Sequence, residues 1–394
     1  MKICAVVCEY NPFHNGHAYQ LAEARRLSGC DKLLCIMSGN FTQRGEMAVF
    51  SKFSRARHAI LSGADAVIEL PAPFAVAPAE LFSEGAIHIL SSIPAVEALA
   101  FGCERGDKES FLRAATALCR EDKEYKAALK ENMKGGTSYK VAQVKTALAL
   151  NEDVDEALLT SPNNVLGTLY CRAILKRGAH IEPLPIPRVG GGYADTAPLK
   201  NFSSATALRA CMRENSRKNK KILKSNLPPA VCSEQLVADK ETFEKVLMSA
   251  LLLKDAEEIA KTPDCSEGLE NRLRAMAKSN PDYDDMLAKI VTKRYTLSRL
   301  RRILLENALG IYQKDVKNYL ETPLYYRVLA VKKESAEELL AALGEGKFSV
   351  VARKSDVLAL KKDAAACFET DVRANDFYNV LTGIHTNEYL MQLI

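Results

Sequence analysis

The stretch Val7–His17, which reads VCEYNPFHNGH, decides the fold of the first half of the chain. It follows the apolar run Ile3–Val7, which has the length and composition of a buried parallel strand. It precedes Ala18–Arg25, where apolar residues recur at helical spacing among good helix formers. A strand, a tight Asn-Pro turn and a helix together present backbone N–H groups to a phosphate at the helix N-terminus. The stretch therefore predicts a phosphate-binding crossover in a parallel α/β sheet.

Two histidines, His14 and His17, distinguish this turn from a generic phosphate loop. In-line attack on an α-phosphorus spreads negative charge over its equatorial oxygens, and two N–H donors held by a rigid turn suit that charge. Gly16 is expected to let the backbone approach the ligand closely. An isolated pair of histidines three residues apart more often lies on the surface or caps a helix. The preceding strand and the NPF turn favour the catalytic interpretation.

Composition is that of an ordinary soluble protein, with 394 residues, 47% hydrophobic and 26% charged residues,. This length predicts two or three domains. The sequence has neither an uninterrupted apolar run of membrane-spanning length nor a cleavable leader, so a cytoplasmic location is expected. The eleven cysteines are scattered singly without a C-x-x-C pair, which favours core positions in a reducing compartment over a zinc site or disulfides,.

Short apolar runs alternate with amphipathic helical patterns over residues 1–225, as in a Rossmann-like parallel sheet. Strands are expected at Lys2–Cys8, Lys32–Met37, Ala66–Leu70, Ala98–Phe101 and Ile181–Ile186, and helices at Lys52–Leu61, Leu81–Ser91, Lys108–Leu118 and Val165–Lys176. Ser225–Pro229 resembles a linker. We therefore predict an α/β nucleotidyltransferase-like domain over residues 1–225 and a mainly helical domain over 226–394. The second half is expected to hold helices at Phe243–Leu253, Gly268–Lys278, Asp284–Ile290 and Ser298–Leu309, with short strands at Pro323–Val331 and Phe348–Val351.

Polar segments follow the predicted strands, where ligands of such sheets bind. After the second strand, Asn40, Gln43 and Arg44 are candidates for contacting a small polar substrate, because a guanidinium bonds both oxygens of a carboxylate. The alternative is a polar surface loop. Lys52 on the following helix either reaches the nucleotide phosphates or lies on a solvated face.

Three further segments come after later strands. Gly102 ends the fourth strand, and it either lets an adenine or ribose pack on the backbone or is a simple turn glycine. Asn163 is a candidate ligand or a helix cap. Arg188, followed by Gly190–Gly192, suggests phosphate binding beneath a mobile loop. Ser203, Ser204 and Arg209 offer hydroxyls and a cation at a helix start; a serine-rich cap is the alternative.

Basic residues concentrate in residues 209–224 and 293–302, although the net charge is only +5. Such clusters can neutralise nucleic-acid phosphates, but most charge runs are solvated faces. The stretch Lys293–Arg302 also contains an aromatic ring, as backbone contact plus base stacking requires. If a helix begins near Thr296, its arginines share roughly one face. A basic amphipathic helix packed on its neighbour is the other interpretation.

Several of these segments together resemble the tRNA(Met) cytidine acetate ligase family, a bacterial family of the nucleotidyltransferase superfamily that carries the H-x-G-H signature. The resemblance runs nearly end to end and rests on long motifs in order: VCEYNPFHNGH, SGNFTQRGE, GADAVIELP, SPNNVLG, IPRVGGGY and FSSATALR. In the second half EGLENRL, KRYTLSRLRR and PLYYRVLA also match. The resemblance implies that ATP and acetate give acetyl-adenylate, which acetylates N4 of the wobble cytidine of elongator tRNA(Met).

The resemblance also implies the residues of the ATP site. They are Val7, Cys8, Glu9, Tyr10, Asn11, Pro12, Phe13, His14, Asn15, Gly16, His17, Ala18, Tyr19, Gln20, Gly102, Asn163, Arg188, Ser203, Ser204 and Arg209. His14 and His17 are assigned to the α-phosphate, and Arg209 with the two serines to the outer phosphates. Acetate or adenylate contacts by Asn40, Gln43 and Arg44 are a physical expectation. Mg²⁺ is expected with ATP, but no D-x-D pattern predicts protein ligands for it.

The helical second half is expected to hold tRNA, with no membrane partner. Candidate tRNA contacts are Lys293, Arg294, Tyr295, Arg299 and Arg302. The alternative function is a small-molecule adenylyl- or cytidylyltransferase of the same superfamily, although such enzymes are usually shorter and lack a basic helical domain. A third possibility is an RNA-binding protein with a decayed nucleotide site, against which the intact His14, Gly16, His17 and Arg209 argue.

Overall fold

A computed structural model describes residues 1–134, 137–189, 201–214, 216–234 and 239–394. Over these residues a single sheet has the strand order β5-β4-β1-β2-β3-β6-β7, and β8 pairs with β6. The strands are β1 (Ile3–Cys8), β2 (Lys32–Ser38), β3 (Ala66–Leu70), β4 (Val96–Cys103), β5 (Glu182–Pro187), β6 (Tyr325–Val331), β7 (Ser349–Val351) and β8 (Gln392–Leu393). The first five pair in parallel, and β6 runs antiparallel to β3.

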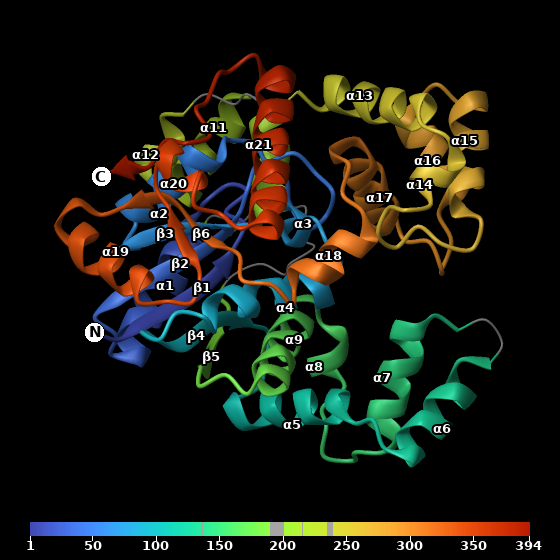
Figure 1. Cartoon of the computed structure of the whole chain (residues 1–394), viewed down its shortest axis with the longest axis horizontal. Helices are drawn as coiled ribbons and strands as arrows, with labels where there is room; N and C mark the ends of the chain where they lie inside the picture. Colours follow the sequence, from blue (N-terminus) through green and yellow to red (C-terminus); the bar gives the residue numbers. More distant parts are fainter. Residues whose placement is uncertain (135–136, 190–200, 215, 235–238) are drawn as a thin grey trace.

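Helices surround this sheet and extend beyond it (Figure 1). Those of the first half are α1 (Asn15–Ser28), α2 (Lys52–Leu61), α3 (Ala72–Ala75), α4 (Ala79–Leu90), α5 (Lys108–Cys119), α6 (Lys123–Asn132), α7 (Tyr139–Ala149), α8 (Ala157–Thr160) and α9 (Pro162–Arg177). Next come α10 (Ala205–Glu214), α11 (Arg217–Asn226), α12 (Pro229–Cys232), α13 (Lys240–Leu253), α14 (Ala256–Ile259), α15 (Leu269–Ser279), α16 (Tyr283–Ile290), α17 (Leu297–Leu309) and α18 (Gln313–Tyr319). The chain ends with α19 (Ala336–Gly344), α20 (Lys354–Val357) and α21 (Lys362–Thr382).

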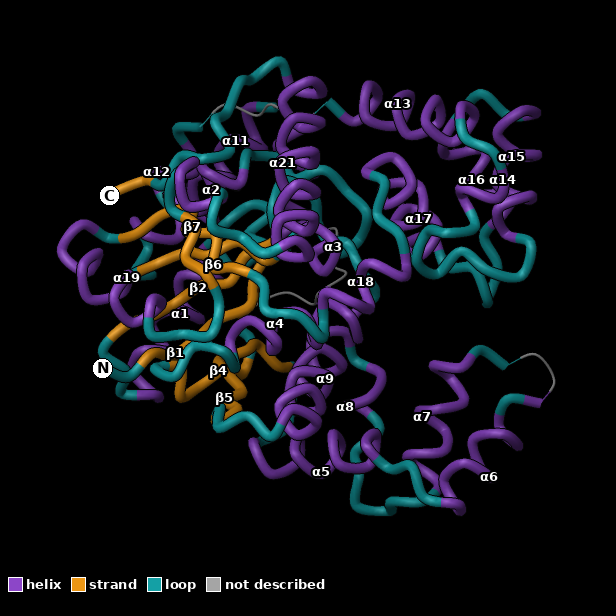
Figure 2. Tube along the Cα trace, viewed as in Figure 1, coloured by secondary structure: helices purple, strands orange, loops and turns teal. Residues whose placement is uncertain are grey.

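Both faces of the sheet are covered, which explains why its central strands are continuous apolar runs (Figure 2),. In β1, Ile3 and Ala5 pack into one core cluster, whereas Cys4 and Val6 pack into the other. The second cluster includes side chains of α1, α2 and α10. The first includes those of α4, α5, α9 and α21 and continues into α13–α17. The predicted α/β class with a mainly parallel sheet is confirmed.

Two groups of helices project from the same side of the sheet, with α6 and α7 in one and α13–α17 in the other (Figure 1). The expected strands and helices are present, with ends shifted by a few residues. Helices α6, α7 and α21 were not expected. All eleven cysteines are free, and eight are buried. No described helix is long and apolar enough to cross a membrane.

The predicted linker Ser225–Pro229 is instead part of the packed structure. It contains the end of α11 and the start of α12, and Asn226 is only 1% exposed. The Asn226 Oδ1 accepts the Ser203 backbone N–H at 2.7 Å. Strand β6 from the second half also pairs with β3, so the sheet crosses the boundary predicted at residue 225. The two-domain division therefore does not describe the sheet, although the helices α13–α18 do form a separate group beside it.

A buried ion cluster joins the end of the chain to the sheet. The Lys52 Nζ lies 2.7 Å from Glu69 Oε2 and 2.6 Å from Glu388 Oε2, and all three side chains are almost fully buried. The Arg327 Nε is 3.4 Å from Glu388 Oε1. Lys52 therefore neither reaches the nucleotide site nor lies on a solvated face, and both interpretations of it were wrong. Its partner Glu388 is 336 residues away.

Replacing Glu388 with alanine should strongly destabilise the protein, because Lys52 and Arg327 would stay buried with one partner fewer. Removing one member of a buried ion pair typically costs about 3–5 kcal/mol. We expect the free energy of unfolding, measured by urea titration with circular dichroism, to fall by about this amount. The control is Glu241→Ala, which removes the exposed Lys245–Glu241 pair and should leave stability unchanged. Equal effects of the two substitutions would contradict the role given to Glu388.

Candidate active site

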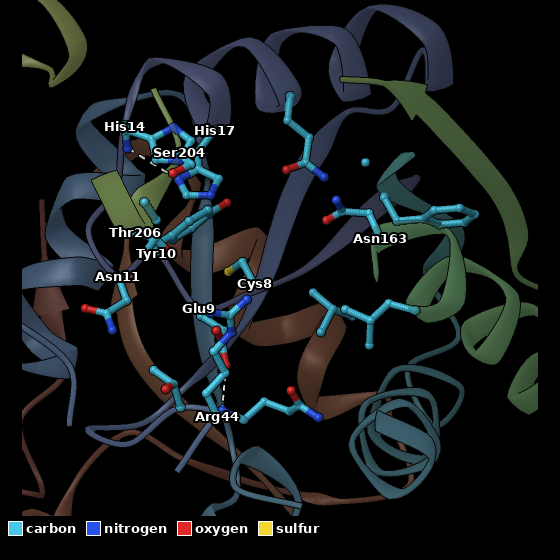
Figure 3. A pocket seen from close by; sticks show the side chains of 18 of the residues that line it. Cys8, Glu9, Tyr10, Asn11, His14, His17, Arg44, Asn163, Ser204 and Thr206 are labelled. Carbon is cyan, nitrogen blue, oxygen red and sulfur yellow. Dashed lines mark hydrogen bonds between the residues drawn. The ribbon is translucent and has the colours of Figure 1, made fainter. Parts of the chain in front are cut away.

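A cavity opens beyond the carboxyl ends of β1, β2, β4 and β5, and its empty volume, open to solvent, is about 1150 Å³. Strand β1 lies between β2 and β4, so the cavity sits where the strand order reverses, the usual ligand site of such sheets,. The predicted residues lining it are Val7, Cys8, Glu9, Tyr10, Asn11, His14, His17, Gln20, Gln43, Arg44, Gly102, Asn163, Arg188, Ser204 and Arg209. An adjoining smaller cavity adds Gly16, Tyr19 and Ser203. Figure 3 shows side chains from these separate segments around one space.

Both histidines are oriented by the turn that starts α1. His14 is the N-cap of this helix, and its Nδ1 accepts the Gly16 backbone N–H at 3.1 Å. The Nδ1 of His17 accepts the His14 backbone N–H at 3.3 Å. A neutral imidazole nitrogen that accepts a hydrogen bond carries no proton, so each ring carries its proton on Nε2. The cap therefore leaves an Nε2–H donor on each of two rings that line the cavity.

Packing keeps the two rings neutral. Their centroids are 3.7 Å apart and nearly parallel, and the Tyr10 ring packs 4.8 Å from that of His17. Burial, followed by the nearby Arg188 charge, lowers the pKa of His14 to about 3. Burial, followed by His14 and Arg188, lowers the pKa of His17 well below its usual range. At neutral pH the pair therefore acts as hydrogen-bond donors without net charge.

Gly16 was expected to let the backbone approach a ligand, but in the structure it is the His14 ring that lies against it. A Cβ at this position would lie 2.9 Å from Cε1 of His14, closer than such contacts normally allow. Because Gly16 has no side chain, the His14 ring can pack against its backbone and cap the helix.

Three arginines and two glutamates line the cavity: Arg44, Arg188, Arg209, Glu9 and Glu46. The Arg209 Nη1 donates to the Asn11 carbonyl at 2.8 Å, and its Nη2 is 3.5 Å from Glu46 Oε2. The Glu9 Oε1 accepts the Gln43 backbone N–H at 2.7 Å, which fixes the loop after β2 against the end of β1. Burial raises the pKa of the Glu9 carboxyl, and Arg209 and Arg44 oppose that rise.

The start of α10 forms one wall of the cavity. The Ser204 Oγ accepts the Ala207 backbone N–H at 3.1 Å, so this serine caps the helix and lines the cavity at once. Thr206 follows on the first turn and Arg209 on the second, and both line the cavity. The two sequence interpretations of this segment, as a cap and as a ligand site, are compatible.

Asn163 and Arg188 meet at the opposite wall. The Asn163 side-chain amide donates to Glu104 Oε1 at 2.6 Å, and Arg188 Nη1 lies 3.4 Å from Asn163 Oδ1. A Cβ at Gly102 would lie 3.4 Å from Cγ of Arg188, in ordinary contact. The glycine stretch Gly190–Gly192 that was expected to form a mobile loop lies outside the described residues.

Some predicted residues lie away from the cavity. Asn40 is 2% exposed, donates to Asn375 Oδ1 at 2.9 Å and accepts the Lys52 backbone N–H at 2.7 Å. Because α21 and α2 occupy both ends of its amide, the expected contact with acetate or adenylate is wrong for Asn40. Within the Val7–Gln20 stretch, the residues that line neither cavity are Pro12, Phe13, Asn15 and Ala18. Phe13 is fully buried in the core beneath the turn.

An apolar wall was missed from the sequence. Phe82, Phe101, Leu166 and Tyr170, from α4, β4 and α9, line the cavity beside Asn163. Each has the spacing of an ordinary core residue of a helix or strand, so no local pattern identifies it as part of a cavity wall. Thr42, Glu46, Ala205 and Thr206 are also lining residues that were not predicted. They neighbour predicted residues, and a wider window around Gln43 and Ser204 would have included them.

The loop after β2 connects this cavity to α17. Glu46, which faces Arg209, also pairs with Arg301 at 2.9 Å. Gly45 has a φ of +71°, and a Cβ there would lie 2.6 Å from backbone atoms of Arg301 and Arg302. The loop therefore touches the backbone of the helix directly.

The candidate tRNA contacts are only partly accessible. Thr296 caps α17, as expected, and Lys293 and Arg294 are exposed before it. Arg299 donates to the Asp264 carbonyl, and its guanidinium stacks 5.3 Å from the Tyr295 ring. Arg302 is 8% exposed and pairs with Asp264 at 3.5 Å. Because Arg302 lies on the packed face of α17, its predicted role as a tRNA contact is wrong.

We expect both imidazoles to show the Nε2–H tautomer in ¹⁵N-¹H correlation spectra at pH 7 and to stay neutral down to pH 5. Unfolded histidine takes up a proton near pH 6.5, whereas His14 does so only near pH 3,. Stability should therefore fall as the pH drops through this interval. His88, whose pKa burial lowers to about 4, provides an internal comparison away from the cavity. A ring of His14 or His17 that titrates near pH 6.5 would contradict the geometry described.

Comparison with known proteins identifies the family. The model of the HIGH nucleotidyl transferase family matches residues 1–392. Proteins named tRNA(Met) cytidine acetate ligase from Acetivibrio thermocellus and Caldicellulosiruptor saccharolyticus are 34% identical over 397 residues and 35% identical over 388 residues. Each alignment covers 96% of this chain and 94% of the relative.

Solved structures agree with this assignment. Apo Thermotoga maritima TmcAL matches with a TM-score of 0.92 at 32% identity, and the form bound with alpha-thio ATP matches with a TM-score of 0.90 at 31% identity. Both matches cover 100% of each chain. The chain therefore belongs to the HIGH nucleotidyl transferase family and, within it, groups with the tRNA(Met) cytidine acetate ligases.

Proposed function

We propose that this protein is an ATP-dependent ligase that forms acetyl-adenylate from acetate and ATP and then acetylates N4 of the wobble cytidine of elongator tRNA(Met). The observation that carries the proposal is the stacked pair of His14 and His17, whose Nδ1 atoms accept backbone N–H groups, at the cavity where the strand order reverses. The names of the relatives support the acetate and the tRNA. The ATP analogue in the Thermotoga maritima structure supports the nucleotide.

In the first step, an acetate oxygen attacks the α-phosphorus of ATP, and the bond to pyrophosphate breaks. His14 and His17 donate hydrogen bonds to the α-phosphate oxygens, where charge grows in the transition state. Arg209, with Ser203 and Ser204, holds the outer phosphates that leave. Arg44 and Gln43 are assigned to the acetate carboxylate, because they line the cavity at the end of β2. Mg²⁺ accompanies ATP as its counter-ion.

In the second step, the N4 amine attacks the acetyl carbon, AMP leaves, and the amine loses a proton. The tRNA must then lie across the cavity mouth with its wobble base inside. The helices α13–α18, with Lys293, Arg294, Tyr295 and Arg299 at one end of α17, are assigned to this task. An enzyme that uses ATP and tRNA in this way works in the cytoplasm. Within the described residues, no cluster of three or more His, Cys, Asp or Glu side chains could hold a metal ion.

The proposal is tested by incubating the protein with ATP, labelled acetate and total tRNA, and then digesting the RNA to nucleosides. Label in N4-acetylcytidine is expected, and it should depend on ATP. Label that appears only in acetyl-adenylate would restrict the function to the first step. No ATP-dependent use of acetate at all would overturn the proposal in favour of a small-molecule nucleotidyltransferase or a non-catalytic RNA-binding protein.

Replacing His17 with alanine removes one of the two donors at the α-phosphate. Loss of one such donor typically costs about 3–4 kcal/mol of transition-state stabilisation, which corresponds to a rate loss of roughly 10²–10³-fold. We expect acetate-dependent exchange of pyrophosphate into ATP to fall by this factor while the fold is retained. The matched control is His88→Ala, away from the cavity, which should keep the exchange rate. Normal exchange in the His17 variant would refute the assigned role.

A further inference from the structure

The outer face of α11 consists entirely of cations. Of its ten residues, the exposed ones are Arg217, Lys218, Lys220, Lys221 and Lys224. The five remaining positions are covered by the protein: Asn219 and Asn226 are buried, and Ile222, Leu223 and Ser225 are half-buried. Leu223 packs against the core cluster that covers one face of the sheet. The apolar side of this amphipathic helix is thus already covered by the protein, and only positive charge faces the solvent.

This charge has no acidic counterpart nearby in the sequence. Between residues 201 and 233 the single acidic residue is Glu214, and its carboxylate accepts a hydrogen bond from the Asn219 amide at 2.9 Å. None of the five α11 cations forms an ion pair with another described residue. Like charges three and four positions apart oppose helix formation. Helix α6 shows the usual arrangement, in which lysines alternate with Glu124 and Glu131.

The basic face is joined to the phosphate end of the cavity. The Asn226 side chain, at the end of α11, holds the backbone of Ser203. The Asn15 side chain, in the first turn of α1, donates to the Ser225 carbonyl at 2.9 Å. Helix α10, which is capped by Ser204 and supplies Arg209 to the cavity wall, has the exposed Arg213 on its last turn, four residues before α11 begins. Anions bound along α11 therefore lie next to the elements that bind the triphosphate.

The other basic cluster offers less free charge. Arg294 pairs with Glu267, Arg299 binds the Asp264 carbonyl, and Arg302 is buried against Asp264. Within the described residues, Lys293 and Arg299 have no ion pair, and the Arg299 guanidinium is held by a backbone carbonyl, while Arg301 pairs with Glu46. A polyanion therefore finds more uncompensated positive charge on α11 than at the start of α17.

We propose that α11, together with Arg213, is a docking surface for the sugar-phosphate backbone of tRNA. This inference rests on the proposed function and adds to it where the substrate is held. RNA phosphates along this face would be neutralised by unpaired Lys and Arg side chains, a contribution that is independent of sequence and sensitive to salt. A membrane surface fits less well, because the apolar side of α11 is packed inside the protein and cannot enter lipid.

The test reverses two of these charges in the full-length chain, Lys220→Glu with Lys221→Glu. We expect the Kd for unmodified elongator tRNA(Met) transcript, measured by filter binding, to rise at least tenfold. The log–log slope of affinity against salt should become shallower by roughly one to two, because the variant neutralises fewer phosphates and binding therefore releases fewer counterions. Acetate-dependent pyrophosphate exchange, which needs no tRNA, should match that of the unaltered protein. The thermal unfolding temperature of the double variant should also equal that of the unaltered protein.

The matched control is Lys361→Glu with Lys362→Glu, another exposed pair of adjacent lysines, which lies at the start of α21. It should leave tRNA affinity nearly unchanged. Equal affinities for both double variants, whether reduced or not, would overturn the docking surface. So would binding of the unaltered protein to phosphatidylglycerol vesicles that requires Lys220 and Lys221 while tRNA binding does not. If the unaltered protein showed no acetate-dependent pyrophosphate exchange, the proposed function would be refuted instead. The tRNA affinities would still decide the role of α11.

Discussion

Two hydrogen bonds from backbone N–H groups to imidazole nitrogens, at the first turn after β1, set the chemistry of the whole site. Helix caps of this reciprocal kind are usually built from a serine or threonine and a glutamate. Here His14 and His17 fill both positions, so the bonds that begin α1 also fix the tautomer of each ring. The helix and its donors form together. A substitution that disturbed the cap would therefore lose both the start of the helix and the direction of the donors.

The sheet holds this turn at the right place, and the end of the chain completes the sheet. The neighbouring strands β1 and β4 both end at the cavity, while β6 and β8 extend the opposite edge beyond β3. The buried cluster of Lys52, Glu69 and Glu388 ties this C-terminal addition to α2 and β3. The catalytic fold is thus built from both ends of the sequence, with helical groups inserted between them.

Local sequence patterns predicted most of the strands and helices and the turn at the centre of the site. Strands flanked by turns, and the spacing of His14, Gly16 and His17, are features of contiguous residues, so sequence periodicity and motif could predict them. Asn40 and Lys52 looked like ligands because their partners, Asn375 and Glu388, are more than 300 residues away. The apolar wall of Phe82, Phe101 and Tyr170 could not be predicted from the sequence, since only tertiary packing distinguishes a residue of a cavity wall from a residue of the core. The linker predicted at Ser225–Pro229 was wrong because its two prolines are typical of linkers, and the sequence alone does not show that Asn226 is buried.

The contact of the loop after β2 with α17 makes the helical group a direct neighbour of the cavity. Glu46 holds Arg209 on one side and Arg301 on the other, and Gly45 leaves no space between the loop and the helix backbone. A shift of α17 would move the carboxylate relative to Arg209 and so change the charge at this wall of the cavity. Under the proposed function, a macromolecule that binds only to these helices would in this way alter the charge around the outer phosphates of ATP.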